Sequence, residues 1–303
     1  MDAEWSLLLA SWQLALEADG YSPATRRTYA KAAGSLASWL AAEHPQLGPG
    51  EFERGHVRGW LVHVRQTRSG ATARTWFAGV RSLCRWLVAE GEAATDATEG
   101  VRTPRAGEPS TPVLSAAELR RLLKVTEGAD FASRRDAAML LLFLDGGLRL
   151  AELGGLQLAD VDLADRLVYV AGKGSRRSGP RLRAIPLGAR ATRALDRYIR
   201  ARRKHPLAHR PELWLGAQGR ALSVEGIRKV VGRRGAQAGL DDLHPHALRH
   251  SWAAAFRQAG GSEGDLLVLG GWRSRAQLDR YGRATAQERA AEAARRYSLG
   301  DRL

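Results

Sequence analysis

A stretch with neither helical nor strand periodicity interrupts the chain about one third of the way along its 303 residues. Residues 91–112 (GEAATDATEGVRTPRAGEPSTP) contain three prolines, three glycines and few apolar side chains. Proline lacks a backbone donor and glycine is costly to order, so such a stretch separates folded units. We therefore predict two domains, residues 1–103 and 113–303, joined by a linker at 104–112. The length agrees, at roughly 150 residues per domain.

The composition excludes several classes of protein. Hydrophobic residues make up 44% of the chain, which is enough for ordinary cores. The best apolar run, residues 137–144, lies between two aspartates and falls short of the ~18 residues of a membrane span. Asp2 and Glu4 do not suit a signal peptide, and the single cysteine, Cys84, excludes an internal disulfide and a multi-cysteine zinc site. We expect a cytoplasmic protein with no membrane association.

Positive charge is concentrated in the second predicted domain. The formal net charge is +15, yet residues 1–112 hold 12 basic and 12 acidic side chains. Between Lys173 and Arg210 there are 13 lysines and arginines against one acid, Asp196. Such a field favours a polyanion, and nucleic acid is the usual one. The alternative is that a biased genome composition enriches the chain in arginine and alanine, but such a bias does not explain why the first third of the chain is neutral.

The first domain is predicted to be a small helical bundle. Ser22 followed by Pro23 is typical of a helix start, and Tyr29, Leu36 and Trp39 then recur at helical spacing. A second helix start at Ser69 precedes apolar residues on one face and arginines on another.

The second domain is predicted to be mostly helical with one small sheet. Ser115 and Glu118 have the spacing of a capping box, and residues 162–187 are typical of two strands joined by a glycine- and arginine-rich turn. Further helices are predicted at 189–204, 224–235, 245–259, 263–269, 275–281 and 285–297. The fold class is therefore mainly α: a helical bundle followed by a mixed α+β domain with a small antiparallel sheet.

Four short motifs in the second domain, distant from one another in sequence, carry candidate functional residues. They are Arg149 after a glycine pair with Glu152 three residues on, Lys173 between two glycines, His246-Ala-Leu-Arg249-His250, and Trp272 followed by Tyr281. Each also has an ordinary explanation. Arg149 and Glu152 suit a helical ion pair, a turn lysine is usually solvated, and Trp272 and Tyr281 suit a core. The two histidines at i and i+4 lack the glutamate of a metalloprotease motif.

In this order and spacing the set resembles the tyrosine recombinase (phage integrase) family, and the resemblance covers the whole chain. It implies a helical core-binding (SAM-like) domain, a linker and a catalytic domain. It also implies that Tyr281 is the nucleophile, attacking a DNA phosphodiester to give a 3′-phosphotyrosyl link and a free 5′-hydroxyl. A phenol with a pKa of about 10 needs a proton acceptor and a stabilised transition state to do this at neutral pH.

The resemblance assigns the remaining catalytic roles. Arg149 and Arg249 would bind phosphate oxygens, which guanidinium forks match. His246 would accept the proton of the attacking tyrosine, and Lys173 would protonate the leaving oxygen. Trp272 stands where many members have histidine; its indole N–H can donate but cannot carry protons. No metal or other cofactor is implied.

Further basic residues are candidates for DNA contacts. The strand-turn-strand segment should approach the DNA backbone through Arg176, Arg177, Arg181 and Arg183. The helical bundle offers Arg26, Arg27, Lys31, Arg74, Arg81 and Arg85. Arg197, Arg200, Arg202, Arg203 and Lys204, around a helix end, are expected to be solvated.

We expect a site-specific recombinase that acts through a Holliday junction as a homo-tetramer on double-stranded DNA in the nucleoid-associated cytoplasm. The compact length suggests a Xer-like enzyme or the integrase of a mobile element, and Trp272 with the residues around Tyr281 favours the integrase of a plasmid, phage or transposon. Accessory or directionality proteins are possible partners. The alanine-rich helix at 285–297 would either dock into a neighbouring protomer or pack on its own domain. Two alternatives stay open: a type IB topoisomerase-like relaxing enzyme, and a catalytically silent DNA-binding protein of the same fold.

Overall fold

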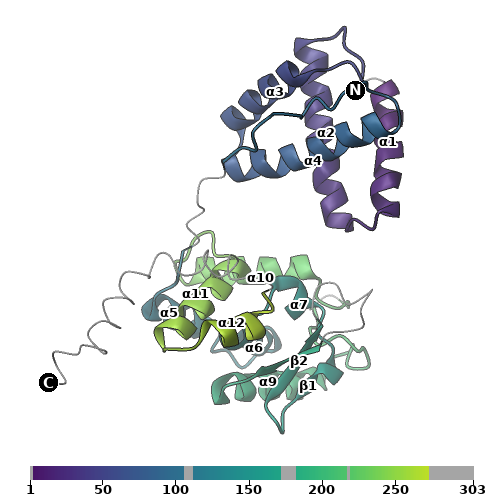
Figure 1. The fold of residues 1–303 in the computed structure, drawn as a ribbon. Helices are drawn as coiled ribbons and strands as arrows, with labels where there is room; N and C mark the ends of the chain where they lie inside the picture. The colour runs from purple at the N-terminus through teal and green to yellow at the C-terminus, as the bar shows by residue number, and fades with distance from the viewer. Residues whose placement is uncertain (1–2, 106–111, 172–181, 217–218, 273–303) are drawn as a thin grey trace, which may run out of the picture. The chain divides into compact units, whose positions relative to one another are not determined.

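The protein divides into two compact units, which we describe separately. The computed structural model describes residues 3–105, 112–171, 182–216 and 219–272 (Figure 1). The units comprise Met1–Pro109 and Ser110–Leu303. The division falls inside the segment 104–112, where the sequence predicts a linker.

Within residues 3–105, four helices form the first unit: α1 (Ala3–Ala18), α2 (Pro23–Glu43), α3 (Arg54–Thr67) and α4 (Gly70–Ala89). The two predicted helix starts are confirmed. The side chain of Ser22 accepts from the amide of Thr25, and that of Ser69 accepts from the amide of Thr72. Each serine thereby satisfies an amide that lacks a helical partner.

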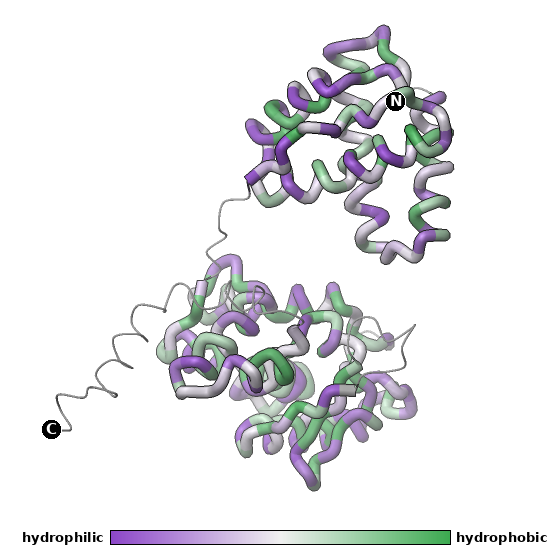
Figure 2. The backbone as a smooth tube through the Cα atoms, in the orientation of Figure 1, coloured by the Kyte–Doolittle hydropathy of each residue, from purple (hydrophilic) through white to green (hydrophobic). Residues whose placement is uncertain are grey.

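The core of the first unit extends into the aperiodic stretch that follows α4. Trp12, Leu36 and Trp60 are fully buried in this core. Ala97 and Val101 are buried in the same cluster. The beginning of the proline- and glycine-rich stretch therefore belongs to the core of the first unit. Along the described parts of both units, hydrophobic and hydrophilic residues are interspersed within each helix, as expected of amphipathic helices (Figure 2).

The second unit is mostly helical and carries a three-stranded antiparallel sheet in the order β1-β2-β3. Its helices are α5 (Ala116–Lys124), α6 (Phe131–Gly146), α7 (Leu150–Gly154), the 3-10 turn η1 (Leu158–Asp160), α9 (Ala189–Arg202), α10 (Val224–Gln237), α11 (Pro245–Gln258) and α12 (Glu263–Gly270). Its strands are β1 (Val161–Asp162), β2 (Leu167–Ala171) and β3 (Leu182–Pro186).

Most of the predicted elements are confirmed. The ends of α9, α10, α11 and α12 lie within two residues of prediction, and Ser115 and Glu118 form the predicted capping box. Val170 pairs with Arg183 in the sheet. The sequence predicts two strands here; the short strand β1 is the one it misses. The turn between β2 and β3 and the helices predicted at 275–281 and 285–297 lie outside the described residues.

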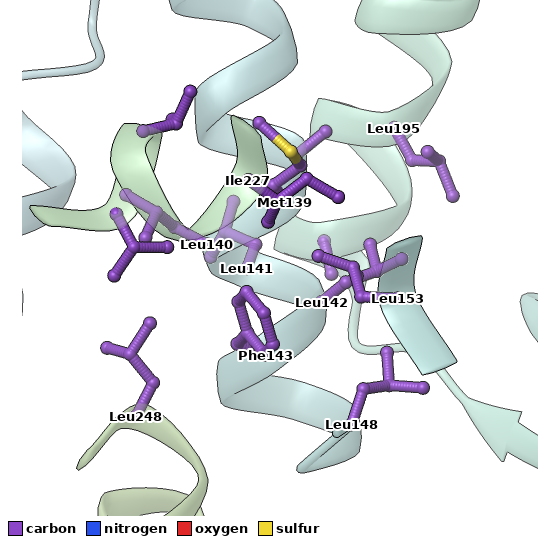
Figure 3. Close-up of a cluster of buried hydrophobic side chains, with 14 of the residues drawn as sticks. Met139, Leu140, Leu141, Leu142, Phe143, Leu148, Leu153, Leu195, Ile227 and Leu248 are labelled. Carbon is purple, nitrogen blue, oxygen red and sulfur yellow. The ribbon is translucent and has the colours of Figure 1, made fainter. Parts of the chain in front are cut away.

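Helix α6 contributes a run of side chains to the buried cluster of the second unit, among them Met139, Leu140 and Phe143 (Figure 3). Residues 138–143 are all buried, including Phe143 at 0% exposure, because α9 and α11 both pack against this helix. Phe131 at its start lies against Tyr198 of α9, whereas Asp145 at its end accepts from the amide of Gly188 before α9. Helices α6 and α9 are therefore antiparallel.

A buried carboxylate fixes α6 to α10. Asp136 is fully buried and accepts from Arg135 at 2.8 Å, Arg233 at 2.9 Å and Arg234 at 2.9 Å. Arg135 and Arg234 also donate to the carbonyls of Leu215 and Val125. A buried charge is tolerated only when it is paired and hydrogen-bonded in this way.

Arg202 corrects one sequence expectation. Expected to be solvated, it is 2% exposed, and it donates to the carbonyls of Leu213, Ala208, Arg210 and Glu212. A guanidinium with five donors satisfies the carbonyls of the segment that follows α9. Within the described ranges, no helix is long and apolar enough to cross a membrane.

Replacing Asp136 with asparagine is expected to destabilise the second unit by about 3–5 kcal/mol, because buried guanidinium groups lose their counter-charge. Urea unfolding of the full chain measures this. Asp196 pairs with Arg200 at 2.9 Å on the surface, so Asp196→Asn should cost no more than about 1 kcal/mol. Equal effects of the two substitutions would contradict the role given to Asp136.

Candidate active site

The start of helix α11 places three candidate side chains on one face. His244 caps the helix, its Nδ1 accepting from the amide of Ala247 at 3.1 Å, and Pro245 occupies the first turn. His246, Arg249 and His250 follow at positions that share a helix face. His244 therefore begins the helix that carries the site.

Arg249 is buried and held by backbone carbonyls. It is 2% exposed, donates from Nη1 to the carbonyl of Gly147, and donates from Nη2 to the carbonyl of Gly270 at 2.6 Å. Its guanidinium lies 4.2 Å from the ring centre of Trp272. These contacts fix the orientation of Arg249 between the ends of α6 and α12.

Arg149 reaches the same place from another element. It precedes α7, and its Nη2 donates to the carbonyl of Gly271 at 2.7 Å. Its side chain is 33% exposed, so solvent reaches this guanidinium. Two arginines that are 100 positions apart in the sequence thus donate to consecutive carbonyls, Gly270 and Gly271, where the end of α12 carries a partial negative charge.

Glu152 is shared by two arginines. It pairs with Arg149 at 2.6 Å, the ion pair that the sequence suggests, and with Arg183 of β3 at 3.0 Å. Burial acts to raise the pKa of the Glu152 carboxyl. The hydrogen bonds and positive charges of Arg183 and Arg149 outweigh burial and lower that pKa. The carboxylate is therefore ionised at neutral pH.

Two stacked indole rings pack against the residues of the site. Trp272 is 8% exposed and stacks on Trp252 with ring centres 5.9 Å apart. Gly147 lies against Trp252 with a φ of +52°, and a Cβ there would stand 1.9 Å from the indole. Only glycine fits both the conformation and the space. The predicted hydrogen-bond donor Trp272 thus also supports the Arg249 guanidinium.

Lowered pKa values keep the imidazole rings of His246 and His250 uncharged at neutral pH. Burial lowers the pKa of His246, and the charges of Arg249, His244 and Arg149 lower it further. Burial also lowers the pKa of His250, to about 4, with charge contributions from His246, His244 and Arg249. The two imidazole rings pack edge to face, with their ring centres 4.5 Å apart. A neutral imidazole can accept a proton, as the predicted role of His246 requires.

The remaining candidates are divided between described and undescribed residues. Lys173, Tyr281, Arg176, Arg177 and Arg181 lie outside the described residues. In the bundle, Arg26 pairs with Glu17 at 2.6 Å, Arg85 lies 3.8 Å from Asp96, and Arg81 lies 4.6 Å from the ring centre of Phe77. The exposed candidates there are Arg27, Lys31, Arg74 and Arg85.

Sequence reasoning missed the groups that hold the arginines in place. These are the carbonyls of Gly147, Gly270 and Gly271 and the second partner of Glu152. Backbone carbonyls leave no signature in a sequence; only the glycine pairs hint at close packing. Among the described residues, no group of three metal-ligating side chains could hold a metal ion.

Comparison with known proteins identifies the fold and the family. A family model described as "Phage integrase family" matches residues 112–288. The chain belongs to the phage integrase family. A curated relative, tyrosine recombinase XerC of Serratia marcescens, is 31% identical over 82% of this chain and 79% of its own length. Tyrosine recombinase XerC of Stutzerimonas stutzeri (strain A1501) is 36% identical over 67% of this chain and 70% of its own.

Solved structures of a recombinase and an integrase share the fold. A XerH site-specific recombinase bound to a palindromic difH substrate has a TM-score of 0.75 at 19% identity, covering 97% of this chain and 85% of its own. A lambda integrase (75–356) dimer bound to a COC′ core site has a TM-score of 0.72 at 18% identity, with coverages of 92% and 96%. The relatives support site-specific recombinase activity, and they do not favour the relaxing-enzyme and silent alternatives.

The lowered histidine pKa values predict how stability depends on pH. Because His250 has a folded pKa of about 4 against an ordinary value of 6.5, the unfolded state binds protons first. The free energy of unfolding should therefore fall as the pH drops from about 6.5 towards 4, by no more than about 3 kcal/mol from this group.

Urea unfolding across this pH range, compared with His250→Gln, measures the contribution. The variant should lose less stability than the parent between pH 6.5 and 4. Histidine resonances followed by NMR should place the His250 midpoint well below that of an ordinary histidine. A midpoint of 6.5 or above would contradict the assignment.

Proposed function

We propose that this recombinase cleaves and rejoins double-stranded DNA through Tyr281, by way of a 3′-phosphotyrosyl intermediate and a Holliday junction. The observation that supports this most is the convergence of two guanidinium groups. Arg149 and Arg249, from different elements, meet at the carbonyls of Gly271 and Gly270. Such a preorganised pair suits a phosphate that gains charge in the transition state.

The two arginines have complementary roles in the proposal. Arg149 is one-third exposed and meets the phosphate from the solvent side. Arg249 lies buried over Trp272, where a low dielectric strengthens its field at the phosphate. The covalent link conserves the phosphodiester bond energy, so rejoining needs no other energy source.

Proton transfer falls to His246 and Lys173. As the Tyr281 oxygen bonds to phosphorus and the bond to the 5′-oxygen breaks, His246 accepts the phenolic proton and Lys173 donates one to the leaving oxygen. The neutral state of His246 supports the acceptor role. Trp272 contributes an indole N–H, which donates to a non-bridging oxygen but moves no proton.

The paired sites are recombined by a homo-tetramer, with residues 1–103 as core-binding domain and 113–303 as catalytic domain. The curated relatives named above are XerC recombinases, which favours a Xer-like role over integration. The solved neighbours XerH and lambda integrase are bound to DNA. The basic excess of the second domain supports DNA as the partner here, in the nucleoid-associated cytoplasm.

The proposal predicts a covalent protein–DNA adduct that depends on Tyr281. Nicked duplexes carrying candidate sites should trap an SDS-resistant adduct through a 3′-phosphate, without added metal. Tyr281→Phe should abolish the adduct while binding the same DNA, because phenylalanine lacks the attacking oxygen. The matched control is Tyr297→Phe, which should form the adduct. An adduct that survives in Tyr281→Phe would contradict the assignment.

The salt dependence of binding should distinguish two neighbouring arginines of α2. Arg27 is exposed, whereas Arg26 is paired with Glu17. Arg27→Ala should reduce the slope of log affinity against log salt by about 0.9, the value for one phosphate contact. Arg26→Ala should change the slope less. Equal slopes for Arg27→Ala and the parent protein would remove Arg27 from the interface.

A further inference from the structure

Arg183 takes part in the catalytic cluster rather than lying on the surface of the sheet. It is a residue of β3, opposite Val170 of β2, and its side chain is only 11% exposed. Its Nη2 lies 3.0 Å from Oε2 of Glu152, and its Nη1 lies 3.4 Å from Oε1. A guanidinium engaged in this way has little surface left for a DNA backbone.

The same carboxylate holds Arg149 through two further bonds. Oε2 of Glu152 accepts from the backbone amide of Arg149 at 2.7 Å, and Oε1 accepts from its Nη1 at 2.6 Å. Both oxygens of Glu152 thus serve both arginines. One negative charge stands between two positive ones, so the three side chains together keep a net charge of +1.

Gly271 brings both arginines against the end of α12. A Cβ at Gly271 would lie 2.3 Å from Nη1 of Arg183 and 3.3 Å from Nη1 of Arg149. The carbonyl of Gly271 accepts from Arg149, beside the Gly270 carbonyl that accepts from Arg249. Arg183 therefore packs against Gly271, next to the carbonyls where the two phosphate-binding candidates meet.

We propose that Arg183 is a positioning residue for recombination. It shares Glu152 with Arg149, so that Arg149 keeps both its orientation and its net charge for the scissile phosphate. This inference rests on the function proposed above. If Arg183 were absent, Glu152 would pair with Arg149 alone and the pair would be neutral. The phosphate would then meet a weaker field in the transition state.

Single-turnover cleavage of a nicked duplex by the full chain tests the proposal. Arg183→Met should slow adduct formation by about 10- to 100-fold at saturating DNA, with the dissociation constant and its salt slope unchanged. Arg183→Lys keeps a positive charge beside Glu152 and should restore most of the rate.

Arg210 supplies a matched control. It pairs with Glu212 through two bonds, as Arg183 does with Glu152, but its side chain is 42% exposed. Arg210→Met should cleave at the parental rate. A loss in Arg210→Met equal to that in Arg183→Met would overturn the proposal.

A substrate with an uncharged group at the cleavage position separates the effect of the Arg183 charge on cleavage from a general loss of structure. A methylphosphonate at the cleavage position lacks one anionic oxygen, so the reaction depends less on positive charge. The penalty of Arg183→Met relative to the parent protein should shrink to less than about threefold on this substrate. A penalty of the same size on both substrates would overturn the proposal, because the residue would then act through the fold alone.

Two other outcomes are equally decisive. Unchanged cleavage at saturation together with a salt slope reduced by about 0.9 would make Arg183 a DNA-backbone contact and overturn the positioning role. If the parent protein binds the DNA but forms no adduct, the proposed function itself is overturned, and this inference with it.

Discussion

Two arginine side chains are held at the end of one helix by consecutive backbone carbonyls, and the rest of the second unit serves to place them. Arg149 donates to Gly271 and Arg249 donates to Gly270. Each arginine comes from a different element, so helices α7, α11 and α12 must meet at one point. The antiparallel packing of α6 against α9, and of α11 on α6, provides the rigid base for that meeting.

Collecting positive charge in a partly buried site is costly unless each charge has a partner. Here the partners are one shared carboxylate, Glu152, the carbonyl ends of α6 and α12, and the ring of Trp272. Carbonyl dipoles satisfy the guanidinium donors without cancelling their charge. The cluster therefore keeps a net positive charge. Such a charge suits a phosphate that gains negative charge in the transition state.

The sequence predicts the elements and the chemistry better than it predicts the contacts. Serine caps and helical periods locate α2, α4, α5 and α9 to α12, because these are local properties of the chain. The four motifs give the candidate catalytic residues by their order. The sequence does not give the shared use of Glu152 by Arg183, since that contact joins a strand to a helix turn 31 positions away.

Burial also separates residues that look alike in sequence. Arg202 and Arg203 are neighbours in a basic run, yet the first is buried among carbonyls and the second is exposed. Likewise Arg26 is paired while Arg27 is exposed. Charge counts predict a polyanionic partner for the second domain as a whole, but only the packing shows which side chains are left for it.

The most direct measurement is a crystal structure of Tyr281→Phe bound to an uncleaved duplex of its own site. The account predicts that the scissile phosphate lies within hydrogen-bond distance, about 2.7–3.1 Å, of guanidinium nitrogens of both Arg149 and Arg249. It also predicts that Glu152 remains bound to Arg149 and Arg183 in that complex. A phosphate beyond reach of both arginines would contradict the central claim.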